Sequence, residues 1–191
     1  NSILKYKDII SSIKSKIEDQ KIIKLPKIIA VSKTFKIEKI LPLIEYGHLD
    51  YGENKVQEAI DKWSETKSQK PDVQLHLIGK LQTNKVKFAL KIFDYIHSLD
   101  SKKLAKKISD EEIKQNKKVK IFIQVNIGDE NQKSGIDKNQ INDLYSYCQE
   151  LKLNIIGLMC IPPVNEDPDK YFKEINILNK KLNLLELSMG M

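Results

Sequence analysis

KIFIQVNIGDENQKSGIDKNQINDLYSYCQELKLNIIGLMCIPP, residues 120–163, contains a strand, a polar loop, a helix and a second strand. The first segment, 120–127, is the strongest strand signal in the chain because it is rich in β-branched residues. After Asp137, which can cap a helix, apolar residues recur at helical spacing. These residues are Ile141, Leu144, Tyr145 and Cys148. A second apolar run at 154–161 stops at two prolines, so the stretch predicts two strands joined by a helix.

The same alternation extends over the whole chain. We expect strands at 27–33, 48–52, 74–79, 95–100, 120–127, 154–161 and 184–189. We expect helices at 3–19, 36–46, 56–63, 83–93, 101–116, 141–148 and 168–183. Strictly alternating strands and helices predict a parallel sheet, and near-continuous apolar strands predict a sheet that is covered on both faces.

Two α/β architectures satisfy this pattern, a doubly wound open sheet and a (β/α)8 TIM barrel. The first strand is not followed by a glycine-rich phosphate loop, which disfavours a dinucleotide-binding sheet. Gln124 and Asn126 share one parity of a strong strand, as expected for the upper lumen of a barrel. We therefore predict one barrel domain over residues 1–191, C-terminally incomplete because the last helix and strand are missing.

The net charge of +7 raises the question of nucleic-acid binding. All 33 basic residues are lysines, whereas arginine is preferred for bidentate contacts with guanine and phosphate. The lysines are spread along the chain among acidic residues, which indicates a solvated surface rather than a binding stripe. We expect no nucleic-acid partner, although the excess charge could steer small phosphorylated ligands.

The location of the protein is indicated by its apolar runs and its cysteines. There is no run of eighteen apolar residues and no leader with a cleavage site. Cys148 and Cys160 form neither a disulfide framework nor a CxxC pair. A reducing cytoplasm, with no membrane contact, is the simplest interpretation.

Lys33 is the leading candidate for chemistry. It is expected to end the first strand, with Thr34 as a helix cap, so that its amine points into the mouth of the barrel. Partial desolvation there would favour the neutral amine that condensation with an aldehyde needs. A lysine that extends from a strand end into solvent is an equally good interpretation of the position alone.

Four further residues lie at strand ends, and each could also have a purely structural role instead of a binding role. Asn54 begins a helix and would serve as a cap. Met159 can pack against a flat ring or fill the core, and Ser188, with Met189 and neighbouring N–H groups, can bind phosphate or form a simple turn. His76 lies between leucines and is expected to be a hydrogen-bonded core residue. The three histidines show no metal-ligand spacing, so we predict no metal site.

As an ordered set, six segments resemble the PLP homeostasis (YggS/PROSC-type) protein family. They are AVSKT (30–34), YGENKVQEA (51–59), HLIGKLQTNK (76–85), VN…DENQKSGI (125–136), GLMCIPP (157–163) and LSMGM (187–191). The resemblance implies a barrel of the alanine racemase N-terminal type that binds pyridoxal 5′-phosphate (PLP). It also implies that the family's last helix and strand, with an Arg-x-Gly-Thr segment, are missing here.

The resemblance further implies roles for individual residues. Lys33 would carry PLP as a Schiff base, and Asn54 would lie near the cofactor ring. Ser188 and Met189 would help to hold the phosphate, and Met159 would lie near the ring. The protein would be a monomer, with PLP-dependent enzymes as transient partners.

A PLP carrier for vitamin B6 homeostasis, without catalytic turnover, is the leading functional hypothesis. Racemases of the fold it resembles take a second acid or base group from a separate domain, for which 191 residues leave no room. A PLP-dependent racemase or decarboxylase of the same fold is the alternative. A cofactor-free Schiff-base aldolase and a purely structural lysine also remain open.

Overall fold

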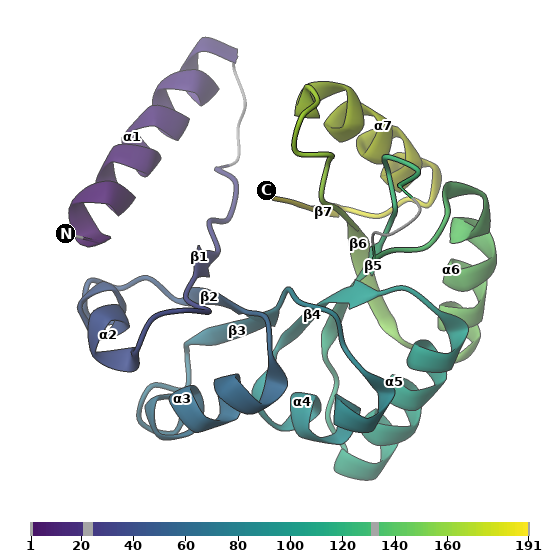
Figure 1. Ribbon diagram of the computed structural model, residues 1–191, viewed down its shortest axis with the longest axis horizontal. Helices are drawn as coiled ribbons and strands as arrows, with labels where there is room; N and C mark the ends of the chain where they lie inside the picture. Colours follow the sequence, from purple (N-terminus) through teal and green to yellow (C-terminus); the bar gives the residue numbers. More distant parts are fainter. Residues whose placement is uncertain (1, 21–24, 131–133, 191) are drawn as a thin grey trace.

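Seven parallel strands lie side by side in chain order and curve into an incomplete barrel (Figure 1). The helices that follow the first strand cover the outer side of the barrel, and the N-terminal helix lies apart from them. The computed structural model describes residues 2–20, 25–130 and 134–190. The strands are β1 (Ala30–Val31), β2 (Asp50–Glu53), β3 (Gln74–Leu77), β4 (Tyr95–Leu99), β5 (Lys120–Gln124), β6 (Asn154–Cys160) and β7 (Glu186–Met189). The α-helices are α1 (Ser2–Gln20), α2 (Ile37–Glu45), α3 (Val56–Gln69), α4 (Val86–Ile92), α5 (Lys102–Gln115), α6 (Ile141–Glu150) and α7 (Pro168–Lys181). Short 3₁₀ turns, η1 (Thr83–Lys85) and η2 (Lys138–Gln140), precede α4 and α6.

The strand order decides between the two predicted architectures. Each strand pairs with its neighbours in the sequence, and every pairing is parallel. A doubly wound sheet reverses its strand order part-way, so that alternative is wrong. The barrel prediction is confirmed, with the last helix and strand of a closed barrel absent.

Side chains of β5 show how the strands separate core from lumen. Ile121 and Ile123 are fully buried and belong to the large core cluster between sheet and helices. Phe122 alternates with them and packs with Tyr95 and Met159 on the inner face of the sheet. This period of two is the alternation predicted for a barrel strand.

Helices α2 to α7 each bury apolar residues, whereas no described side chain of α1 is buried. In α3 these residues are Val56, Ala59 and Trp63, whereas Ile60 is only half-buried. This packing, rather than helix propensity, is the main source of helix stability in a globular protein. Within the described ranges, no helix combines the length and the apolar character needed to cross a membrane.

Gly157 permits the close packing of β6 against β7. A Cβ atom at this position would lie 2.0 Å from the carbonyl oxygen of Glu186. The register between β5 and β6 also shifts between Ile121 and Phe122, next to this glycine. Both features bend the sheet where the lumen of the barrel begins to close.

β1 and β7 form the edges of the sheet in the described part of the chain. Side chains there are open to solvent, with Val31 and Met189 each 48% exposed and Leu185 94% exposed. In Figure 1 the β7 end and the β1 end face each other across the open side of the barrel.

Three details differ from the prediction. Strand β1 ends at Val31, so Lys33 lies in the turn that follows, where Phe35 N–H donates to Ser32 O at 3.0 Å. Lys36 rather than Thr34 is the N-cap of α2, because this turn delays the helix start to Ile37. Asp137 precedes a 3₁₀ turn and makes no side-chain capping bond.

Candidate functional site

An open cavity of about 1740 Å³ occupies the lumen and draws residues from every strand. Five side chains singled out in the sequence line it together: Lys33, Asn54, Met159, Ser188 and Met189. They come from the segments that follow β1 and β2 and from the C-terminal halves of β6 and β7. This is the end of the sheet at which barrels carry their binding residues. Lys133, in the polar loop after the strand at 120–127 and a further lysine that could approach the mouth, lies outside the described residues.

Lys33 lines this cavity at its edge but is exposed rather than enclosed. The reason is that β1 is an edge strand, which leaves the open side of the barrel next to it. The desolvation expected from the sequence is therefore absent in this structure.

The backbone beside Lys33 is held firmly although its side chain is exposed. Ser32 is 3% exposed, and its N–H donates to the carbonyl oxygen of Gly52 at 3.0 Å. Its hydroxyl donates to Glu53 Oε1 at 2.7 Å. These two bonds tie the end of β1 to β2 at the residue immediately before Lys33.

Glu53 is the centre of a buried polar cluster behind these strands. Besides Ser32, its Oε1 accepts hydrogen bonds from Lys62 Nζ at 2.8 Å and from Trp63 Nε1 at 2.9 Å. Lys62 also donates to the carbonyl oxygen of Ser32 at 2.8 Å. The cluster of Ser32, Glu53, Lys62 and Trp63, called here the Glu53 cluster, thus fixes the turn of Lys33 from the helix side.

The main chain of Asn54 packs closely against Gly79. A Cβ atom at Gly79 would lie 2.2 Å from the carbonyl oxygen of Asn54. Both residues line the cavity, and Ile78 N–H donates to the carbonyl oxygen of Glu53 at 2.9 Å. The contact explains why the segment after β3 needs a glycine, and it places Asn54 at the cavity wall.

Met159 and Ser188 are neighbours across the β6–β7 pairing. Met159 is 5% exposed and packs with Tyr95 and Phe122, so one wall of the lumen is apolar and aromatic. Ser188 is half-buried, and Met189 after it is exposed at the rim. A flat apolar ligand with one polar end would match this wall.

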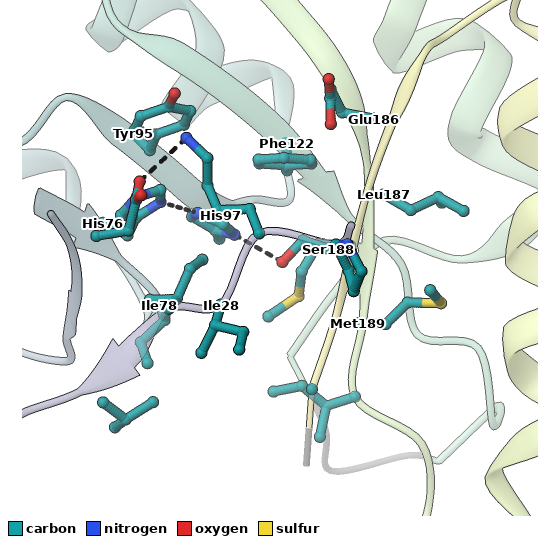
Figure 2. A pocket seen from close by; sticks show the side chains of 18 of the residues that line it. Ile28, His76, Ile78, Tyr95, His97, Phe122, Glu186, Leu187, Ser188 and Met189 are labelled. Carbon is teal, nitrogen blue, oxygen red and sulfur yellow. Dashed lines mark hydrogen bonds and ion pairs between the residues drawn. The ribbon is translucent and has the colours of Figure 1, made fainter. Parts of the chain in front are cut away.

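A chain of four polar side chains crosses the lumen from β2 to β7. Figure 2 shows three of them, His76, His97 and Ser188. Asp50 Oδ1 lies 2.9 Å from His76 Nε2, and His76 Nδ1 lies 2.9 Å from His97 Nε2. His97 Nδ1 in turn lies 2.7 Å from Ser188 Oγ. We call this set (Asp50, His76, His97 and Ser188) the lumen relay. It ends on a residue that the sequence singled out.

Aromatic rings and lysines surround the lumen relay. The His76 ring stacks on Tyr95 at 4.1 Å between centroids, and the His97 ring stacks on Phe122 at 4.5 Å. Lys27 Nζ lies 3.1 Å from Asp50 Oδ1. Each of the two histidine rings thus stacks on one aromatic ring, which restrains its plane and keeps the hydrogen bonds of the relay in their directions.

Burial and contacts set the charge state of the relay. Burial, together with the nearby His76, lowers the pKa of His97 to about 3. Burial also lowers the pKa of His76, although its hydrogen bond to Asp50 opposes this. Burial disfavours the ionised form of Asp50, but its contacts with His76 and Lys27 outweigh burial and hold its pKa below the usual value. At neutral pH the relay therefore contains one carboxylate and two neutral imidazoles.

The prediction that His76 is a hydrogen-bonded core residue is confirmed, since it is 1% exposed and bonded at both ring nitrogens. The sequence analysis did not connect it with His97 or Ser188. Inward parity on adjacent strands was a usable signal, because all four relay residues lie on inward-facing positions. Within the described ranges, no three His, Cys, Asp or Glu side chains are grouped to hold a metal ion.

Residues 11–188 match the family described as alanine racemase, N-terminal domain. A relative from Aquifex aeolicus, named pyridoxal phosphate homeostasis protein, is 38% identical over 175 residues, covering 86% of this chain and 76% of the relative. The chain belongs to the pyridoxal phosphate homeostasis protein family. A further member of that name, from Pasteurella multocida, is 35% identical over 176 residues with the same coverage.

Solved structures agree with this membership. PipY of Synechococcus elongatus, solved with PLP bound, is 31% identical, covers 94% of this chain and 89% of its own, and has a TM-score of 0.79. An alanine racemase of Clostridium difficile is 14% identical with a TM-score of 0.68. This second likeness concerns the fold alone, which the pyridoxal phosphate homeostasis protein family shares with the racemase barrel.

Proposed function

We propose that this chain binds PLP on Lys33 and serves intracellular PLP homeostasis without catalytic turnover. The observation that carries the proposal is that the Lys33 amine and the Ser188 hydroxyl line one cavity, as expected for the two ends of PLP. The PLP-bound state of the relative PipY and the names of the curated relatives support it.

The donor set of the cavity fits PLP. An exposed primary amine, the apolar wall around Met159 and Phe122, the amide of Asn54 and the hydroxyl of Ser188 all face one space. When bound, PLP supplies an aldehyde that condenses with the Lys33 amine with loss of water. The chain's own residues orient the ring against the aromatic wall and hold the phosphate near Ser188 and Met189.

The state of the lumen histidines supports a carrier rather than a catalyst. Proton transfer at a substrate requires a positioned group with a free acid or base site. Both ring nitrogens of His76 and of His97 are already in hydrogen bonds within the relay. Tyr95 accepts a hydrogen bond from Lys120 at 3.0 Å, so its hydroxyl is also engaged.

The remaining properties follow from the same site. Residues 1–191 act as one PLP-binding domain, because the cavity uses every strand of the sheet. The protein works as a cytoplasmic monomer that contacts PLP-dependent enzymes transiently and binds neither nucleic acid nor membranes. Cys148 and Cys160 are free and buried, which suits a reducing compartment.

Borohydride reduction of the PLP-treated protein, followed by peptide mapping, tests the attachment. We expect the reduced pyridoxyl group on Lys33, and loss of the visible imine band in Lys33→Ala. Lys39→Ala, an exposed lysine on α2 outside the cavity, should keep both signals. Labelling at another exposed lysine that lines the cavity, such as Lys80 after β3, would contradict the assignment.

Turnover is tested separately with a panel of amino acids. The carrier proposal expects no racemisation and no decarboxylation above the rate of free PLP. Turnover that disappears in Lys33→Ala would overturn it in favour of a racemase or decarboxylase.

A further inference from the structure

The hydrogen bonds of the lumen relay can run in only one direction while Asp50 is ionised. A carboxylate only accepts, so His76 donates through Nε2–H and its neutral ring leaves Nδ1 as an acceptor. His97 must then donate through Nε2–H, and its Nδ1 becomes an acceptor. The proton of the 2.7 Å bond between His97 and Ser188 therefore belongs to the serine hydroxyl.

The charged and titratable groups around the relay reinforce this direction. They are Lys27 in the segment before β1, Tyr95 in β4, Lys120 in β5 and Glu186 in β7. Lys27 contacts Asp50 directly, and Lys120 is bonded to Tyr95. Lys27 favours the ionised carboxylate, so an added proton is directed to the imidazoles rather than to Asp50.

This direction determines what Ser188 offers to a ligand. With its hydrogen donated to His97, the hydroxyl oxygen presents only lone pairs to the cavity. A phosphate dianion is also an acceptor without a hydrogen, so the two would repel each other. The relay as it stands does not offer the hydroxyl as a donor to a fully ionised phosphate.

We propose that His97 is a positioning residue that makes the Ser188 subsite bind a phosphate monoester together with one proton. The inference rests on the proposed function, because it takes Ser188 as the place where the phosphate of PLP is held. The ligand class is a phosphate monoester on an aromatic ring.

The proton count follows from the bonds. In the free relay, three hydrogens lie between the four groups, on His76, His97 and Ser188. If Ser188 donates to phosphate and keeps its bond to His97, His97 must donate through Nδ1–H as well as Nε2–H, which its pKa of about 3 opposes. That arrangement contains four hydrogens, so one proton enters from solvent. If the phosphate instead brings its own hydrogen and donates it to Ser188, one proton again accompanies the dianion.

Pyridoxine 5′-phosphate and pyridoxine form the test pair, since neither has an aldehyde and only the first has a phosphate. Calorimetric titration in buffers of different ionisation enthalpy measures the protons taken up on binding. At pH 8, well above the second phosphate pKa of about 6, we expect the phosphorylated ligand to take up close to one proton more than pyridoxine. Its affinity should fall about tenfold per pH unit above pH 7.

His97→Phe keeps an aromatic ring beside Phe122 but removes the acceptor that holds the Ser188 hydrogen. We expect the extra proton uptake to fall to near zero in this variant, with a flat pH profile. His48→Gln is the matched control, because His48 is a buried histidine bonded to the main-chain oxygen of Asp50 at 2.9 Å and lies outside the relay. It should keep the wild-type proton count.

Several outcomes would overturn the inference. They are equal proton uptake for the two ligands in the wild-type protein, unchanged uptake in His97→Phe, and no gain in affinity from the phosphate. The wild-type measurement decides even if His97→Phe fails to fold. None of these results depends on the amine of Lys33, whose reaction is read independently from the PLP absorbance band. A protein that forms the imine but takes up no extra proton would retain the proposed function and lose this inference.

Discussion

The two ends of the cavity are positioned in opposite ways. At Lys33 the main chain is fixed, since the Glu53 cluster holds Ser32 from the helix side, and the lysine side chain is left exposed. At Ser188 the side chain itself is fixed, because its hydroxyl ends a hydrogen-bond chain that crosses the lumen. A fixed backbone with a free amine suits a group that must reach and release an aldehyde. A fixed hydroxyl suits a group that must select one state of an anion.

Removing the carboxylate behind Lys33 should have the largest effect on stability. Glu53→Ala removes the carboxylate that pairs with the nearly buried Lys62 and accepts from Ser32 and Trp63, so we expect a loss of about 3–5 kcal/mol. Urea unfolding followed by circular dichroism measures it. Glu58→Ala, at an exposed pair with Lys55, should cost no more than about 0.5 kcal/mol. Equal costs for the two variants would show that the Glu53 cluster does not anchor the turn.

Two glycines at opposite ends of the cavity provide the second comparison. Gly79→Ala would push a Cβ into the main chain of Asn54, and we expect it to destabilise the protein by about 2–3 kcal/mol. Gly190→Ala meets no atom within 4 Å and should stay within about 0.5 kcal/mol of the wild type. Urea midpoints that move equally for both would contradict the tight contact at Asn54.

Part of the acid sensitivity of the fold should come from His97, at the Ser188 end of the cavity. The pKa of His97 is about 3 in the folded protein and about 6.5 when unfolded, so the unfolded state binds more protons between these values. Stability is therefore fully present above pH 6.5 and is lost as the pH falls. His97→Phe should reduce this loss by up to about 1.4 kcal/mol per pH unit between pH 6 and 4. Lys33→Ala should leave the slope unchanged when unfolding is measured over that range.

Two buried serines provide the smallest contrast. Ser32→Ala removes a hydroxyl that donates to Glu53, and we expect a loss of about 1–2 kcal/mol and weaker PLP labelling of Lys33. The hydroxyl of Ser98, although 1% exposed, has no hydrogen-bond partner among the described residues. Ser98→Ala should therefore be neutral or slightly stabilising. Thermal unfolding and the yield of borohydride-trapped Lys33 measure the two effects.

The fold was predictable because each strand and helix shows its own period in the sequence. All seven strands were expected, and β5 even showed which side chains face the lumen. The start of α2 was misplaced because the turn at Ser32 to Phe35 depends on bonds to β2, which no local pattern reveals. Exposure of Lys33 likewise follows from the edge position of β1.

The candidate site was only partly predictable for the same reason. Lys33, Asn54, Met159, Ser188 and Met189 could be chosen because each lies at or near a strand end, and they do line one cavity. The relay joins residues separated by 26, 21 and 91 positions. The relay depends on the register between neighbouring strands and on which side chains meet in the lumen. The periodicity of a single segment shows neither.

Trp63 makes the Glu53 cluster observable by tryptophan fluorescence. It is the only tryptophan of the chain, and its indole N–H is bonded to the carboxylate that also holds Ser32, one residue before the reactive amine. Its fluorescence should therefore report on the turn of Lys33 without an added label. Cofactor loading and release become visible as a change in emission from a ring buried outside the barrel lumen.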